Sequence, residues 1–144
     1  MPGAADKRPE SVLVIVAART GEVLVLTRRQ PAGFRQSVTG SLAWGESAWS
    51  AAVRELGEET GLSAEGLIDL EIGARFRIRP EWRARFGPGV RENVEHWFLL
   101  WVDAPVPVRL SPEHTEASWM PLQQALRSID SWTNRLAIER YLQD

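Results

Sequence analysis

Residues 40–62 of the chain read GSLAWGESAWSAAVRELGEETGL and combine a helical pattern with a concentration of acidic residues. Ser47 suits the N-cap of a helix and Gly61 suits the position just after its end, so the predicted helix runs to about Thr60. One face of that helix is predicted to be apolar, with spacings of i, i+3, i+4 and i+7 between Trp49, Ala52, Val53 and Leu56.

The acidic residues of this helix are Glu55, Glu58 and Glu59. Their spacing of i, i+3 and i+4 projects them from one side, about a quarter-turn from the apolar stripe. Glu55 and Glu59 repel each other by about 0.2–0.5 kcal/mol in an isolated helix, and both Glu58 and Glu59 lie where the helix dipole disfavours negative charge. A solvated acidic face is one interpretation. The other, which we favour because something must offset the repulsion, is a site for a divalent cation.

The composition limits what kind of cation site this can be. The chain has no cysteine and only two histidines, so a metal must be bound mainly by oxygen atoms, which favours Mg²⁺, with Mn²⁺ as the alternative. An Asp-rich calcium loop with a central glycine is not present in the sequence. We therefore expect Mg²⁺ at these glutamates.

Length and charge bound the partners. With 144 residues the chain is expected to form one domain over 1–144, and 17 basic against 19 acidic residues give a net charge of −2. No overall positive field would recruit nucleic acid or an anionic membrane, so we expect a small-molecule partner. The polar start, MPGAADKRPE, and the absence of a long apolar run predict a cytoplasmic protein, and we expect a monomer.

The remaining segments predict a mixed sheet covered by helices, an α/β or α+β sandwich. Residues 11–18 and 22–29 read as a β-hairpin, 36–40 as a short strand in an otherwise irregular segment, and 67–78 and 93–102 as further strands. Helices are expected at 121–128 and 131–143.

The stretch with which we began resembles the Nudix box, GX5EX7REUXEEXGU, in which U is an aliphatic residue. Every defined position of that motif is met, by Gly40, Glu46, Arg54, Glu55, Leu56, Glu58, Glu59, Gly61 and Leu62. The resemblance implies an α/β/α sandwich with a mixed sheet and a loop–helix–loop catalytic element. It also implies an enzyme that hydrolyses a nucleoside diphosphate linked to another moiety, using divalent ions to activate water and neutralise phosphate charge.

The resemblance also assigns roles within the box. Glu55 and Glu59 would be the principal metal ligands, and Glu58 would complete the shell or orient water. Arg54 and Glu46 would form a bond that fixes the loop. The two box glycines, Gly40 and Gly61, would serve backbone geometry.

Further segments are similar to a folate-pathway branch of the family, namely KRPESVLVIV, FRQSVTGSL, PGVRENVEHWF, EHTEASWMP and SWTNRLAIERYL. This similarity implies Mg²⁺-dependent cleavage of 7,8-dihydroneopterin 3′-triphosphate to the monophosphate and pyrophosphate, with purine dNTPs such as dATP as secondary substrates. One alternative is a housecleaning (d)NTP pyrophosphohydrolase. A noncatalytic nucleotide-binding module is disfavoured because such a module is expected to lose box glutamates.

The same similarity implies four substrate contacts, by Lys7, Arg28, Thr39 and Ser131, and a further metal ligand or base at Glu113. Plainer roles remain open for the four: a solvated tail cation, a strand-end surface charge, a turn cap and a helix N-cap respectively. Glu113 is expected to lie on a loop that joins the site when substrate is bound.

Several other residues have less definite roles. Arg75, Arg77 and Arg79 alternate along a predicted strand and would either meet phosphates or protect an edge strand from aggregation, and we favour the edge. His96 is expected to be packed or partly exposed rather than catalytic, whereas His114, next to Glu113, is the better candidate of the two histidines for a functional role. The aromatic residues of the 93–102 strand are expected in the core: Trp97, Phe98 and Trp101.

Overall fold

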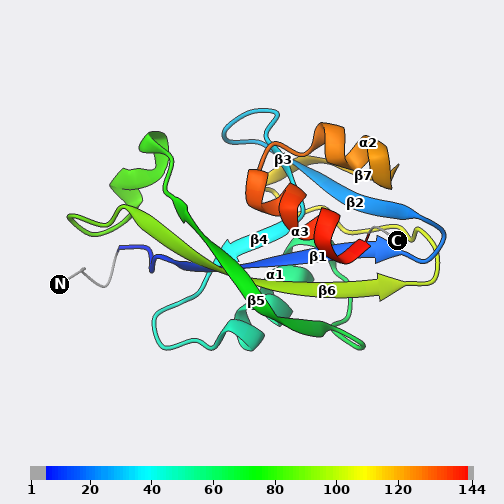
Figure 1. Cartoon of the computed structure of the whole chain (residues 1–144), viewed down its shortest axis with the longest axis horizontal. Coiled ribbons are helices and arrows are strands. Elements are labelled where there is room, and N and C mark those ends of the chain that lie inside the picture. The colour runs from blue at the N-terminus through cyan, green and yellow to red at the C-terminus, as the bar shows by residue number, and fades with distance from the viewer. Residues whose placement is uncertain (1–5, 143–144) are drawn as a thin grey trace.

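The computed structural model describes residues 6–142 and is built around one mixed β-sheet (Figure 1). In these residues the sheet has seven strands in the order β3-β2-β1-β6-β5, with β4 paired to β1 and β7 paired to β2. The strands are β1 (Glu10–Ala18), β2 (Glu22–Arg28), β3 (Arg35–Gln36), β4 (Val38–Ser41), β5 (Ile68–Arg77), β6 (Glu92–Val102) and β7 (His114–Pro121). The helices are α1 (Ala48–Thr60), the 3₁₀ helix η1 (Pro80–Arg85), α2 (Leu122–Ser128) and α3 (Trp132–Leu142).

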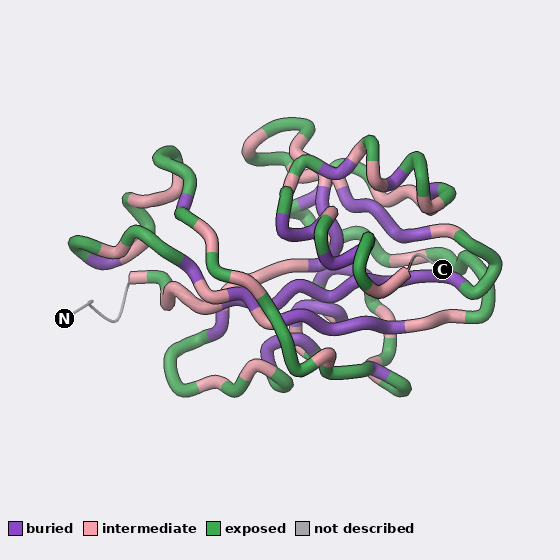
Figure 2. Tube along the Cα trace, viewed as in Figure 1, coloured by how far each residue is buried: buried purple, intermediate pink, exposed green. Residues whose placement is uncertain are grey.

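Strand β1 is buried on both faces because helices cover both sides of the sheet (Figure 2). It runs parallel to β6 along its whole length. Val12, Val14 and Val16 face the core beneath α1, and the alternate residues Leu13 and Ile15 face the core beneath α2 and α3. The predicted α/β/α sandwich with a mixed sheet is therefore confirmed.

The predicted hairpin of β1 and β2 is correct in order and wrong in extent. The two strands pair only at their closed end, through Ala17 and Val23. Beyond that point β1 pairs with β4, while β2 pairs with β3 and β7. The two strands separate toward the far end of the sheet, where residues of β1, β3 and β4 line a cavity.

Helix α1 has the predicted ends but not the predicted buried face. Ser47 caps the N-terminus through its side chain, and Gly61 adopts the left-handed conformation at the C-terminus with φ of 74°. Trp49 and Val53 are 46% and 36% exposed, which contradicts the apolar stripe proposed from the sequence. The residues of α1 that are buried are Ala51, Ala52, Glu55, Leu56, Glu59 and Thr60. The buried face of α1 is therefore turned relative to the predicted one, and it places Glu55 and Glu59 against the protein interior.

The remaining elements agree with the sequence in part. Both C-terminal helices form where predicted, but β7 and η1 were not foreseen. Strand β5 pairs only with β6 and is an edge strand of the sheet. Arg75 and Arg77 lie on it and are exposed, whereas Arg79 lies beyond its end, beside η1; since Arg77 and Arg79 also line the cavity described below, the edge role stays a prediction. No helix in residues 6–142 is long and apolar enough to span a bilayer.

Candidate active site

Two of the three box glutamates are buried, and the third is exposed. Glu55 and Glu59 are 9% and 2% exposed, and their carboxyl groups interact directly. Burial raises the pKa of Glu59, and the adjacent Glu55 carboxylate raises it further, although a backbone hydrogen bond from Thr39 opposes the shift. Glu58 is exposed and lies 3.4 Å from Arg54. The same Arg54 Nη1 donates to Glu55, so one guanidinium nitrogen links Glu55 and Glu58, and the role of Glu58 at the metal stays a prediction.

Gly40 leaves the space that the Glu55 carboxyl group occupies. A Cβ atom at Gly40 would lie 2.2 Å from Glu55 Cδ and 2.5 Å from both carboxylate oxygens. Gly40 does not have a positive φ, unlike Gly61. Glycine is therefore required at position 40 for lack of space, whereas the prediction had both glycines serving backbone geometry; that prediction is corrected for Gly40.

Arg54 and Glu46 form the bond that the sequence predicted. Arg54 Nε and Nη2 donate to the two Glu46 oxygens at 2.9 and 2.8 Å. Glu46 also accepts from the Ala43 backbone N–H, and these hydrogen bonds lower its pKa to about 2. Arg54 Nη1 donates to Glu55 at 2.6 Å. The pair thus ties the loop before α1 to the helix and to one of the site carboxylates.

His114 lies behind the glutamates and was only suspected from the sequence. It is 2% exposed, and its Nε2 lies 3.7 Å from Glu59 Oε1. Among the described residues neither atom has a hydrogen-bond partner. The ring pairs through Nδ1 with Ser111 Oγ, while burial and then the Arg28 charge lower its pKa. Its surroundings therefore disfavour a positive charge on His114 next to Glu59. His96, in contrast, is partly exposed as expected and pairs with Glu10 at 2.6 Å.

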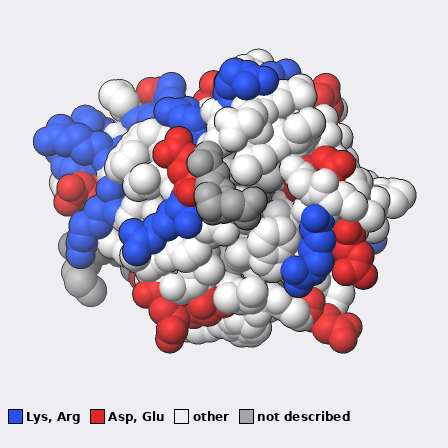
Figure 3. All heavy atoms as spheres, turned by 45° about the vertical axis from the view of Figure 1, so that its right-hand side comes forward, with Lys and Arg blue, Asp and Glu red and all other residues white. Residues whose placement is uncertain are grey.

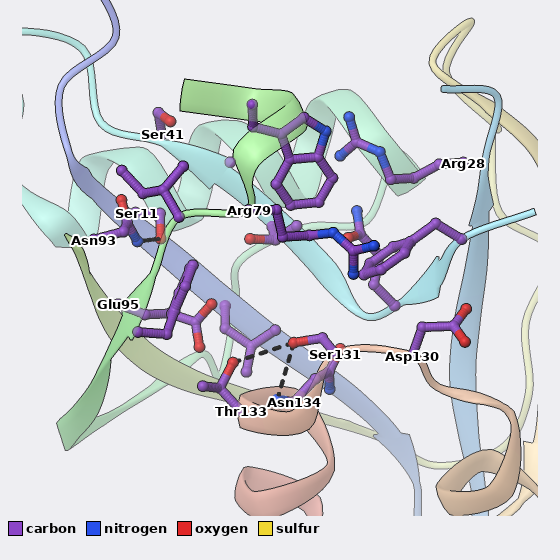
Figure 4. Close-up of a pocket in the computed structure, with 18 of the residues that line it drawn as sticks. Ser11, Arg28, Ser41, Arg79, Asn93, Glu95, Asp130, Ser131, Thr133 and Asn134 are labelled. Carbon is purple, nitrogen blue, oxygen red and sulfur yellow. Dashed lines mark hydrogen bonds between the residues drawn. The ribbon is translucent and has the colours of Figure 1, made fainter. Parts of the chain in front are cut away.

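A cavity of about 680 Å³ opens beside the glutamates (Figure 4). It collects most of the residues singled out in the sequence, although they come from both ends of the chain. Glu58 and Glu59 are not in its lining, since one is exposed outside it and the other lies behind Glu55. The predicted site residues that line it are Lys7, Arg28, Thr39, Gly40, Glu55, Glu113 and Ser131.

The plainer roles considered for the four predicted substrate contacts are only partly observed. Ser131 stands directly before α3 and accepts a 3.4 Å hydrogen bond from Asn134 N, so it caps this helix and also lines the cavity. Thr39 donates to the Val12 carbonyl at 2.9 Å. Lys7 is not a free tail, because its backbone N–H donates to the Arg85 carbonyl. Lost hydration and the neighbouring arginines lower the pKa of the Lys7 ammonium group.

Cations and aromatic rings form the mouth of the cavity. Arg77, Arg79 and Arg85 join Lys7 and Arg28 in its lining, and Figure 3 shows basic side chains gathered toward one end of the face that it draws. Arg79 lies over the rings of two of the aromatic residues in the lining, Phe34 and Trp82, at 5.4 and 5.5 Å from their centroids, and Arg28 lies 5.6 Å from the Trp82 centroid. Cations facing a cavity whose inner wall carries carboxylates suit a polyanion that brings its own divalent cation.

The closed end of the cavity holds polar residues that the sequence analysis missed. The buried ones are Ser11, Gln36, Asn93, Glu95, Thr133 and Asn134. A signal existed for one of them, because Glu95 is an acid within the apolar run of β6. The others carry no pattern that distinguishes a cavity residue from an ordinary polar residue.

The carboxylates can be compared with the needs of a divalent ion. Within residues 6–142 no three acidic or histidine side chains are already gathered around one point. Yet Glu59 Oε1 is buried without a hydrogen bond, and Glu55 beside it is an oxygen donor of the kind that Mg²⁺ prefers. The residues fit a site with two protein ligands in place, to which the exposed Glu113 can be added from the cavity wall. Such a partial set matches Mg²⁺, which usually keeps several waters.

Comparisons with known proteins agree with this geometry. The chain is 39% identical over 141 residues to the dihydroneopterin triphosphate diphosphatase of Escherichia coli K12, covering 94% of this chain and 93% of that protein. It is 35% identical to the enzyme of the same name from Haemophilus influenzae, covering 94% and 89%. The solved structure of the E. coli dihydroneopterin triphosphate pyrophosphohydrolase superposes with a TM-score of 0.89, covering 95% of this chain and 97% of that one. The model of the NUDIX domain matches residues 7–141, and the chain therefore belongs to the Nudix family.

Proposed function

We propose that this chain hydrolyses 7,8-dihydroneopterin 3′-triphosphate to dihydroneopterin monophosphate and pyrophosphate, with Mg²⁺ as cofactor and purine dNTPs such as dATP as secondary substrates. One observation carries the proposal: a single cavity has Glu55 and Glu113 on its wall and Lys7 and Arg28 in its lining. The relatives named for this activity supply the substrate class. We further propose that the enzyme is a cytoplasmic monomer with one domain over residues 1–144 and that it does not act on nucleic acid.

The chain's own residues divide the work of the reaction. Lys7 and Arg28 lower the free energy of bringing a triphosphate into the cavity, because they neutralise its charge in a partly dehydrated setting. Glu55 and Glu59 would hold Mg²⁺, with Mn²⁺ as a substitute, and Arg54 fixes the position of Glu55. When bound, the ion would polarise the phosphoryl group and lower the pKa of water.

Glu113 is the residue best placed to act from outside the helix. It is exposed just before β7, and its charge is felt at Lys7, Arg28 and Glu59. Its backbone carbonyl accepts from the Arg29 N–H at 2.9 Å, which anchors the loop while leaving the side chain free to move. We assign it to a ligand of the cation or to the acceptor of the proton released by water.

Steady-state kinetics with Mg²⁺ test the assignment. We expect kcat/KM for the pterin triphosphate to exceed that for dATP, and Glu59→Gln to reduce both by at least about 100-fold. A large preference for dATP would replace the proposal with a nucleotide-cleaning role. If Glu59→Gln left turnover unchanged, the assignment of the metal ligands would be wrong.

A further inference from the structure

The inner end of the cavity contains a buried acid that the reaction described above does not use. Glu95, on β6, is 4% exposed and lines the cavity. Its carboxylate accepts a 3.0 Å hydrogen bond from Trp97 Nε1; burial raises the pKa of Glu95, and Trp97 and the Thr133 hydroxyl group oppose that shift. No Lys, Arg or His of the described chain lies within ion-pair distance of it. A carboxylate has about four acceptor positions, so the bond from Trp97 leaves acceptor capacity unused.

A buried amide donor on β3 lines the same cavity, although β2 and β1 separate β3 from β6 in the order of the sheet. Gln36, on β3, is 4% exposed, and its Nε2 is without a hydrogen-bond partner among the described residues. Buried donors are nearly always paired in folded proteins, because an unpaired donor loses its hydration without compensation. An unpaired donor and an acid with spare acceptor capacity in one cavity indicate a ligand that carries the complementary groups.

The polar residues around these two are fixed by one another (Figure 4). Asn93 donates to Ser11 Oγ at 2.7 Å. Asn134 pairs twice with Ser37, accepting from its backbone N–H at 2.7 Å and donating to its hydroxyl at 3.0 Å. These bonds hold the wall around Glu95 in one arrangement, so that it is organised before a ligand binds.

The position of Glu95 within the sheet is also tightly constrained. Gly73, in the irregular part of β5, lies so close to β6 that a Cβ there would be 1.8 Å from the Glu95 carbonyl oxygen. The backbone that carries Glu95 is therefore held between β1 and β5. Such rigidity suits a residue that measures the shape and hydrogen-bonding pattern of a ligand.

We propose that Glu95 and Gln36 select the head group of the substrate, a 2-amino-4-oxopyrimidine ring. Glu95 accepts from the ring N–H and the neighbouring 2-amino group, and Gln36 Nε2 donates to the 4-oxo group. Dihydropterin and guanine present this sequence of groups, whereas adenine presents an amino donor beside a ring-nitrogen acceptor. The inference deepens the proposed function and rests on it for the identity of the cavity as the substrate site.

Two variants separate recognition from a structural role. Glu95→Gln keeps the shape of the side chain but replaces one acceptor oxygen with a donor, and Gln36→Met removes the amide at similar volume. Glu139→Gln, on the exposed side of α3 and far along the helix from Thr133, is the matched control. Thermal denaturation of all three, with the wild type, establishes that they fold.

Binding is measured by calorimetry with dGMP and dAMP, and kcat/KM is measured with the pterin triphosphate, dGTP and dATP. We expect Glu95→Gln to weaken dGMP binding and to lower kcat/KM for the pterin triphosphate and dGTP by about 10- to 100-fold, the range for a hydrogen bond to a charged group. Values for adenine nucleotides should change less than about threefold, and Gln36→Met should shift selectivity in the same direction. Glu139→Gln should change nothing.

Equal losses for guanine and adenine nucleotides in both variants would assign Glu95 to structure and overturn the proposal. Wild-type preference for dAMP over dGMP would also overturn it. If Glu95→Gln does not fold, the selectivity of Gln36→Met decides the question. Because binding of the monophosphates requires no hydrolysis, this result stands even if the pterin triphosphate proves not to be a substrate.

Discussion

Replacing Gly40 with alanine should disable the enzyme while leaving its fold nearly intact. The added Cβ would lie 2.2 Å from Glu55 Cδ, whereas unbonded carbons settle about 3.5–4.0 Å apart. The carboxyl group must therefore retreat by at least about 1.3 Å, the difference between the two distances. Because this group ends a flexible side chain, the strain is that of a displaced rotamer, about 0.5–1.5 kcal/mol. Melting temperature should fall by no more than about 5 °C.

The catalytic effect of the same change should be much larger. A misplacement of about 1 Å in a catalytic arrangement typically reduces the rate by about 100-fold, so kcat for the pterin triphosphate should fall by at least that factor. The apparent affinity for Mg²⁺ should weaken as well. Steady-state assays over a Mg²⁺ titration, beside thermal denaturation, measure both effects.

Two controls make this prediction sharp. Gly57 lies in α1, the helix that carries Glu55, and has nothing within 4 Å of an added Cβ; Gly57→Ala should therefore stabilise the protein by about 1 kcal/mol without loss of activity. In a Glu55→Ala background the Gly40→Ala change should cause no further loss, because the group it displaces is gone. The reasoning is refuted if Gly40→Ala keeps activity within about threefold of wild type. It is also refuted if Gly40→Ala destabilises the Glu55→Ala variant as much as it destabilises the wild type.

Three further results are expected. Arg54 holds the pKa of Glu46 at about 2, below its ordinary 4.5, so the stabilisation is complete above about pH 5 and is lost as the pH falls toward 2. Glu46→Gln should be less stable than wild type by denaturant unfolding near pH 7, and this difference in stability should narrow below about pH 4.5 and close only near pH 2. Glu59→Gln should abolish hydrolysis yet raise the melting temperature in EDTA near pH 7. Burial and Glu55 raise the pKa of Glu59, so folding without a metal requires this carboxyl group to take up a proton, whereas the amide does not; an unchanged or lower melting temperature would contradict this. Chelation by EDTA should abolish activity, and Mg²⁺ should raise the melting temperature of wild type but not of a Glu55→Gln, Glu59→Gln double variant, as thermal-shift measurements can show.

The sequence predicted the fold well where the structure depends on residues close together in the chain. The caps at Ser47 and Gly61 located the ends of α1, runs of valine, isoleucine and leucine located β1 and β2, and an aromatic and leucine-rich run located β6. Strand β7 was missed because it alternates weakly between exposed and buried positions. The separation of β1 from β2 could not be predicted, because it depends on the competing pairing of β4 with β1, a contact distant in sequence.

The site shows the same division. The motif located Glu55, Glu59 and the Arg54–Glu46 bond, since their geometry is set within one helix and its preceding loop. It did not show that Trp49 faces outward, because an apolar pattern cannot tell which of two adjacent faces the sheet will cover. The roles of Gly40 and Glu95 depend on atoms brought together from separate strands and helices, so they become visible only in the three-dimensional structure.

The most direct test of the central claim is the phosphorus product released from 7,8-dihydroneopterin 3′-triphosphate by the purified protein with Mg²⁺. Assayed separately, pyrophosphate and orthophosphate distinguish cleavage between the α and β phosphates from removal of the terminal phosphate. We predict one pyrophosphate for each dihydroneopterin monophosphate formed, with no orthophosphate. Release of orthophosphate, or no release from this substrate while a nucleotide is turned over, would contradict the account.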